Sequence, residues 1–311
     1  MLSRVADSLF WMSRYMERTD SVMRMLKTNY AASQDLSSGF SWQPALKIFA
    51  ALGKEDAGML EKDSRVVLQY MVTNRDNDNS IFNMVTLARE NARSVQDHIT
   101  IELWQCLNAF YHLIRDEHIE AGLKYDDPIT TLDALIKQSM VYYGVSESTM
   151  FRGEGFSFMN LGRYLERALQ SINVLDVKFS DLSYDLEKTA DITYWKHLLM
   201  SISGYNLYLK TYRAGFDARN ILHQVIFNTD FPRSVLYSLN QLEYNFHQLQ
   251  NDVDAESFAN INFAIGRLRS KIQYSNLDHV SKVGLHNYLV SINEDLLGIG
   301  SALNQYYFAY S

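Results

Sequence analysis

Residues 2–23 read LSRVADSLFWMSRYMERTDSVM, and the apolar residues in this stretch recur at intervals of three and four positions. The recurring residues are Leu2, Val5, Leu9, Met12, Met16 and Met23. This spacing places their side chains along one face of an α-helix. The stretch therefore predicts a long amphipathic helix at the start of the chain.

The same periodicity predicts a second long helix of about eight turns that begins at Ser80. Its apolar stripe consists of Val85, Ala88, Ala92, Val95, Ile99, Cys106, Ala109 and Leu113. The alternation and the Asn-Gly or Asp-Gly turns typical of strands are absent from the sequence. Only 14 glycines and 3 prolines occur in 311 residues, which leaves room for long helices. The sequence therefore predicts an all-α fold.

Turn-forming residues divide this helical chain into segments. We expect the first helix to end at residues 37–39, Ser-Ser-Gly, and a further helix to open at Asp127 and Pro128. Residues 74–79 form a polar loop, after which Ser80 is placed to cap the next helix. The remaining breaks are expected at residues 151–155 and 228–234.

An internal repeat accompanies these segments. Arg14-Tyr15-Met16-Glu17-Arg18 returns as Arg163-Tyr164-Leu165-Glu166-Arg167. Further matches follow in the same order: Trp42 with Trp195, Asp63 with Asp217, Arg65 with Arg219, and Ser80 with Ser234. Such collinear matches predict a duplication into residues 1–149 and 150–311, each of about five helices. We expect the two halves to pack as a pseudo-symmetric bundle in one compact unit.

The composition excludes several classes of protein. The net charge of −7 and the isoelectric point of about 5.6 argue against general binding to nucleic acid or to an anionic membrane, because no basic excess exists. The single cysteine excludes an internal disulfide framework and a cysteine-based zinc site. No apolar run reaches the roughly 18–20 residues of a membrane span, and no signal peptide opens the chain. The expected compartment is the cytoplasm.

Several polar residues fall where an amphipathic helix is normally apolar. Glu17 and Asp20 border the stripe of the first helix, and Asn91 and Glu102 lie near the stripe of the helix from Ser80. A buried carboxylate is costly unless a cation meets it. The arginines available for this are Arg14, Arg18, Arg89, Arg93, Arg163 and Arg167.

Three interpretations of these residues remain open. They form solvated ion pairs at i,i+3 and i,i+4 spacing, each contributing a few tenths of a kcal/mol. They form a buried lattice that fixes how the two halves dock. Or they form a binding site for an anionic ligand.

Metal and thiol chemistry find little support. Three pairs at i,i+4 spacing each combine histidine with a carboxylate: His98 with Glu102, His112 with Asp116, and Glu243 with His247. A di-iron bundle needs Glu-x-x-His twice, which the chain lacks. Cys106 has no histidine at i±3 or i±4 to activate it, so we expect it to pack in the core. We expect neither a metal nor a cofactor.

The sequence resembles the alpha-E family of bacterial all-helical proteins. The resembling segments are residues 2–18, 88–93, 102–104, 151–152, 161–167 and 231–234. They lie in order along nearly the whole chain. The first loop departs from the pattern, because it lacks the proline that the second loop has at Pro232. Asp20, and Leu169 in the second copy, also depart from the glutamate expected there.

The resemblance implies a set of site residues and a functional context. The polar set consists of Arg4, Arg14, Glu17, Arg18, Arg89, Glu90, Asn91, Arg93, Glu102, Arg152, Arg163, Glu166 and Arg167. Members of this family tend to be encoded beside circularly permuted ATP-grasp amide ligases and transglutaminase-like proteins. That context implies a role in forming or modifying a peptide-like product.

Two functions fit these observations. The first is an accessory or binding protein that holds a ligase, a transglutaminase-like partner or their peptide through arginines. The second is an enzyme with a cleft between the halves, in which Glu17, Glu90, Glu102 or Glu166 acts as acid or base beside arginines that hold an anionic or acyl-phosphate group. No complete catalytic constellation is visible, so whether the protein is an enzyme stays open.

Overall fold

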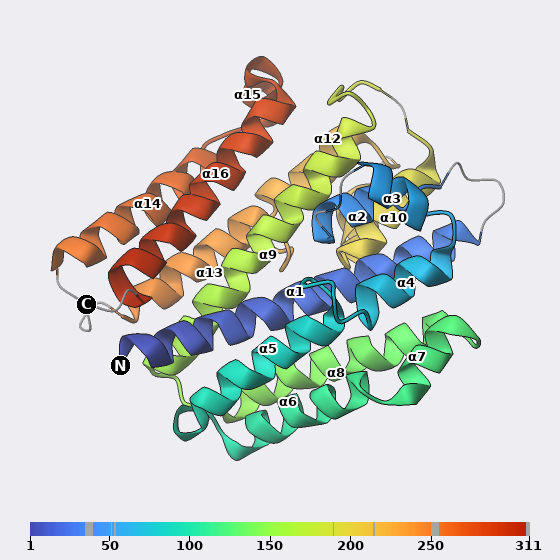
Figure 1. The fold of residues 1–311 in the computed structure, drawn as a ribbon. Coiled ribbons are helices and arrows are strands. Elements are labelled where there is room, and N and C mark those ends of the chain that lie inside the picture. Colours follow the sequence, from blue (N-terminus) through green and yellow to red (C-terminus); the bar gives the residue numbers. More distant parts are fainter. Residues whose placement is uncertain are drawn as a thin grey trace. The chain divides into compact units, whose positions relative to one another are not determined.

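The computed structural model describes residues 1–34, 40–50, 52, 54–188, 190–213, 215–249 and 255–308. All regular elements among these residues are helical, which confirms the all-α prediction (Figure 1). The helices before residue 150 are α1 (Ser3–Ser33), α2 (Gln43–Phe49), α3 (Lys54–Leu60), α4 (Ser64–Val72), α5 (Ile81–Ser94), α6 (Ile101–Ile114), α7 (Glu117–Lys124) and α8 (Pro128–Thr149).

The later helices are α9 (Glu154–Ser180), α10 (Ile192–Ser201), α11 (Tyr205–Thr211), α12 (Ala218–Leu222), α13 (Val235–His247), α14 (Ala255–Gln273), α15 (Leu277–Val283) and α16 (Leu285–Leu303). In the described part of the chain, α-helices are thus more numerous in each half than the five or so expected, because short helices lie between the long ones. No helix in the described residues combines the length and the hydropathy needed to cross a membrane.

The chain divides into two compact units, Met1–Arg14 with Phe151–Ser311 and Tyr15–Met150. In the first unit α9 packs against α13 and α16, and α14 packs against the same two helices (Figure 1). In the second unit α6 packs against α5 and α8, and α7 packs against α4 and α8. The duplication at residue 150, and the packing of both halves as one compact unit, stay predictions.

Side-chain hydrogen bonds cap the helices that start after the predicted loops. Ser80 accepts a hydrogen bond from the backbone of Asn83, and Ser234 accepts one from the backbone of Tyr237. Asp127 accepts from two backbone N–H groups, and Pro128 is the first residue of α8. Each cap satisfies amides that a helix leaves unpaired in its first turn. The loops predicted at 74–79 and 228–234, and the break before α9, are therefore confirmed.

The long helix predicted from Ser80 is wrong, because it is two helices. Helix α5 ends at Ser94, a 3₁₀ turn covers Gln96–His98, and Thr100 caps α6 through the N–H of Leu103. Helices α5 and α6 then pack against each other. The expected end of the first helix at residues 37–39 lies outside the described residues, and α1 extends to Ser33.

Candidate functional site

Helices α1 and α9 approach each other at Gly162. A Cβ atom on Gly162 would lie 2.2 Å from the carbonyl oxygen of Phe10, which is closer than any real contact. Only glycine permits this approach of two backbones. Phe10 itself is buried. One helical turn further along each helix lie Arg14 and Glu166, so the approach at Gly162 sets the distance between their side chains.

Arg14 and Glu166 form a charge-assisted ion pair. The Nε and Nη2 atoms of Arg14 donate to Oε2 of Glu166 at 2.9 and 2.7 Å, and Oε1 accepts from Gln170 at 2.7 Å. The Glu166 side chain is 0% exposed and that of Arg14 is 12% exposed. The Arg14 guanidinium also lies 4.6 Å from the Trp11 ring centroid. Both oxygens of Glu166 are therefore engaged by groups of the protein itself.

Arg167, the residue after Glu166, binds the backbone. Its Nη1 donates to the carbonyl oxygen of Pro232 at 3.2 Å, and its side chain is buried. One turn later, the Ser171 hydroxyl donates to the carbonyl oxygen of Arg233 at 2.7 Å. Together these bonds tie α9 to the loop at 228–234, directly before the cap at Ser234.

A second buried carboxylate cluster lies in the unit Tyr15–Met150. Glu17 accepts from the hydroxyl of Tyr143 at 2.6 Å, and Asp20 accepts from the hydroxyl of Ser139 at 2.6 Å. Both carboxylates are 0% exposed. Asp20 also pairs with Arg24 at 2.8 Å. Burial opposes the charge on Arg24, yet its hydrogen bond to Asp20 and the surrounding negative charge keep its pKa above the ordinary value.

Side chains on α5, α6 and the loop before α5 form what we call the arginine–aromatic row, in which Arg75 and Arg115 are exposed and Phe82 is buried. It consists of Arg75, Phe82, Arg115, Tyr111, Arg89 and Trp104. Successive guanidinium-to-ring-centroid distances along it are 4.9, 5.6, 5.0, 4.5 and 5.4 Å. These distances are in the range of cation–π contacts.

Hydrogen bonds fix the orientation of two arginines in this row. Nε of Arg89 donates to Asn108 at 2.7 Å, and its Nη1 lies 2.6 Å from a carboxylate oxygen of Glu90. Nη1 of Arg115 donates to the hydroxyl of Tyr111 at 3.0 Å. Because Arg75 and Arg115 are exposed, the row presents positively charged guanidinium groups at the surface.

The remaining predicted site residues do not gather in one place. Arg93 is 65% exposed and pairs with Glu90 at 3.4 Å. Arg4 is exposed, and Arg18, Asn91 and Arg163 are half-buried. Arg152 is exposed, with its guanidinium 3.9 Å from the Phe156 ring centroid. The structure thus buries Glu17, Glu166 and Arg167 of the predicted set, leaves Arg14, Arg18, Arg89, Asn91 and Arg163 half-buried, and exposes Arg4, Glu90, Arg93, Glu102 and Arg152.

Glu102 is exposed, although its place beside the predicted stripe suggested burial. It lies in the first turn of α6, after the break at residues 95–100 has changed the helical phase. A carboxylate in a first turn interacts favourably with the helix dipole while it stays in water. Its predicted proximity to the core is therefore wrong.

Neither metal nor thiol chemistry gains support from the geometry. Within the described residues, no group of three His, Cys, Asp or Glu side chains is placed to hold a metal ion. Cys106 is buried on α6, as expected, and burial raises the pKa of its thiol to about 11. A thiol with that pKa is protonated at neutral pH and is a poor nucleophile.

Sequence reasoning missed several partners of the predicted residues. Tyr143 and Ser139 are one turn apart on α8, and Tyr111 and Asn108 lie on α6. Ser139 and Tyr143 are four residues apart and Glu17 and Asp20 are three apart, so each pair lies about one turn apart on one helix face, which is the sequence signal available. It becomes informative only once α8 is known to face α1.

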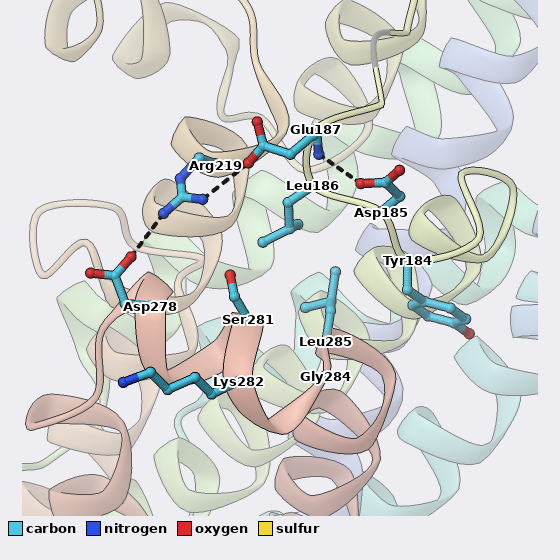
Figure 2. Close-up of a pocket in the computed structure, with 10 residues that line it drawn as sticks. All are labelled: Tyr184, Asp185, Leu186, Glu187, Arg219, Asp278, Ser281, Lys282, Gly284 and Leu285. Atoms are coloured by element: carbon cyan, nitrogen blue, oxygen red, sulfur yellow. Dashed lines mark hydrogen bonds and ion pairs between the residues drawn. The ribbon is translucent and has the colours of Figure 1, made fainter.

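The sequence also provided no indication of two cavities, which share Arg219 and Asp278 as lining residues. The larger, of about 650 Å³, lies between the segment after α9 and helices α12 and α15 (Figure 2). The smaller, of about 520 Å³, is lined by His223 and Phe227 of the π-helix that follows α12. The Arg219–Asp278 pair stands at the boundary between them.

Comparison with known proteins places this geometry in context. The model of the Alpha-E family, described as a predicted alpha-helical domain with a conserved ER motif, matches residues 1–308. The dipeptide Glu-Arg occurs in the chain at Glu17-Arg18 and at Glu166-Arg167. The glutamates of both dipeptides are the two buried ones described above.

Proteins similar to nearly the whole of this chain come from mycobacteria. Uncharacterized protein Mb2597 of Mycobacterium bovis, and uncharacterized proteins MT2643 and Rv2567 of two Mycobacterium tuberculosis strains, are each 21% identical over 96% of this chain. The chain spans 35% of the length of each of these relatives. No solved structure matches the chain.

Proposed function

Because this chain belongs to the Alpha-E family, and because its motif glutamates are enclosed by protein groups, we propose that it is a binding domain rather than a catalyst. We propose that it serves a peptide-forming or peptide-modifying system in the cytoplasm. Its partner would be an ATP-grasp amide ligase or a transglutaminase-like protein. The family resemblance motivates the choice of partner.

One contrast carries this proposal. Glu17 and Glu166 are 0% exposed, whereas Arg75 and Arg115 of the arginine–aromatic row are exposed. Arginines stacked on aromatic rings lose little side-chain freedom when they bind, and they bind carboxylates with good geometry. Arginine and aromatic side chains also dominate binding energy at protein interfaces. The row therefore suits an acidic surface of a partner.

The test is capture of the named partners. The tagged chain is purified from its native cells, and ATP-grasp ligases and transglutaminase-like proteins are identified by mass spectrometry. We expect stoichiometric recovery of one of them with the original chain. The double variant Arg89→Gln/Arg115→Gln should bind it about tenfold or more weakly, since interface arginines often contribute more than 1 kcal/mol each.

The matched control is Arg267→Gln, which removes an exposed arginine from α14. Its recovery of the partner should equal that of the original chain. The proposal is wrong if neither class of protein is recovered, or if the row variant and the control bind equally well.

A further inference from the structure

The larger cavity combines an apolar wall with an arginine. Leu186 and Leu285 line it, together with Tyr184, Ser281 and Arg219. Figure 2 shows the Ser281 side chain pointing toward the Arg219–Glu187 bridge and the two leucines facing the same opening. Pockets with an apolar lining and a few convergent polar groups are the usual sites for small ligands.

Arg219 binds two carboxylates that belong to exposed side chains. Its Nη1 lies 3.2 Å from Glu187, and its Nη2 lies 3.1 Å from Asp278. Both carboxylate side chains are 79% exposed, and that of Arg219 is 39% exposed. Exposed pairs of this kind change an equilibrium constant by only about 1.4- to fivefold. An incoming carboxylate can therefore replace Glu187.

Arg65, the arginine at the matching position of the predicted first repeat, has different hydrogen-bond acceptors. Arg65, like Arg219, lies two residues after a capping aspartate. Its Nη1 donates to the carbonyl oxygen of Leu123 at 3.1 Å, and its Nη2 donates to that of Asp126 at 3.0 Å. These acceptors are backbone atoms and cannot move aside. Arg219 therefore binds side-chain carboxylates that can be displaced, beside a cavity, whereas Arg65 binds fixed backbone carbonyl oxygens.

Unusual backbone conformations hold two walls of this cavity. Ser183 and Tyr184 have φ angles of 57° and 59°, and Gly284 between α15 and α16 has a φ of 90°. Tyr184 donates its N–H to the carbonyl oxygen of Phe179 at 2.8 Å, which stabilises the reversal after α9. Left-handed conformations in residues other than glycine are strained and concentrate at functional sites.

We propose that this cavity binds a small organic carboxylate that carries an apolar group. The ligand carboxylate takes the place of Glu187 on Arg219, and the apolar group contacts Leu186 and Leu285. Glu187 marks the position where a carboxylate binds. This site shares no residue with the arginine–aromatic row and does not depend on the proposed function.

The test uses N-acetyl-L-leucine as the carboxylate probe and the neutral N-acetyl-L-leucinamide as its matched control. Affinity is measured by isothermal titration calorimetry on the full chain. The site is located by methyl NMR of Leu186 and Leu285. We expect the acid to bind and to shift both sets of methyl signals, and the amide to bind at least about tenfold more weakly, since charge-assisted hydrogen bonds are the stronger class.

Two variants should change the affinity for the acid in opposite directions. Glu187→Gln removes the internal competitor, so the acid should bind about two- to fivefold more tightly. Arg219→Gln should weaken binding about tenfold or more. Arg267→Gln should change nothing. The proposal is overturned if the acid and the amide bind equally well, or if the methyl signals of Leu186 and Leu285 do not shift. It is also overturned if Glu187→Gln does not bind the acid more tightly. The Glu187→Gln measurement remains a valid test even if Arg219→Gln fails to fold.

Discussion

Arg14 on α1 donates two hydrogen bonds to a single carboxylate oxygen of Glu166 on α9, across 152 residues of sequence. Glu166 stands in one of the two Glu-Arg dipeptides of the chain, and its side chain is fully buried. Glu166 therefore links α1 to α9, through two residues that are 152 positions apart in the sequence. This arrangement gives the first prediction.

Glu166→Gln should strongly destabilise the fold. The substitution leaves the Arg14 guanidinium, 12% exposed, without its counter-charge. Breaking a buried ion pair on one side costs about 3–5 kcal/mol. Urea unfolding followed by circular dichroism measures the change in the free energy of unfolding.

The matched control for this prediction is Glu90→Gln, whose carboxylate is 47% exposed in its pair with Arg89. It should lose no more than about 1 kcal/mol. Equal losses in the two variants would show that the Arg14–Glu166 pair is not a special stabilising contact.

Gly162→Ala should destabilise the protein even though alanine favours helices. The added Cβ meets the carbonyl oxygen of Phe10 at 2.2 Å, so α1 and α9 must separate. Overpacking of this kind costs about 1–3 kcal/mol. Gly298→Ala in α16 is the control, because nothing lies within 4 Å of its Cβ, and it should gain up to about 1 kcal/mol. Thermal melts that shift in the same direction for both variants would contradict the close approach.

Tyr143→Phe should lower stability by about 1.5–3 kcal/mol, because it removes a hydrogen bond to the buried carboxylate of Glu17. The control is Tyr274→Phe, at a ring that is 82% exposed, and it should change stability by less than about 0.5 kcal/mol. A double-mutant cycle with Glu17→Gln isolates the coupling between the two residues. A coupling energy near zero would mean that this hydrogen bond contributes nothing.

Cys106 should make the stability fall at high pH. Burial raises the pKa of its thiol to about 11, whereas an unfolded thiol ionises about two units lower. Between pH 9 and 11 the unfolded chain therefore binds fewer protons than the native chain, and stability decreases as pH rises. The loss by pH 11 is about 2 kcal/mol relative to Cys106→Ala, measured by urea unfolding. Identical pH profiles for the two proteins, or rapid reaction of the native thiol with Ellman's reagent at pH 7, would contradict this.

The helices that sequence periodicity predicted best are those with clear caps and stripes. Ser80 and Asp127 cap helices as expected, and Ser234 does the same, because these side chains satisfy first-turn amides whatever packs nearby. The break between α5 and α6 was missed because residues 95–100 contain neither glycine nor proline. Val95 and Ile99 also continue the apolar spacing across the break, so periodicity alone joined two helices into one.

Part of the site was also accessible from the sequence. The positions of Glu17 and Asp20 beside the apolar stripe predicted burial, and both are fully buried. Their partners Tyr143 and Ser139 depend on the register of α8 against α1, which no local pattern contains. Arg14 pairs with Glu166 of α9, a partner that tertiary packing decides and that the local pattern of its own helix does not contain.

The division of α1 between the two compact units has a consequence for how the protein is made. Residues 15–150 form a continuous unit that can fold as soon as it has left the ribosome. The other unit needs residues 1–14, and Arg14 waits for Glu166 during 152 residues of synthesis. At ordinary elongation rates that delay is about 8–30 s. Residues 1–14 thus find their place only after residues 15–150 have been made, and no continuous fragment of the chain contains that unit alone.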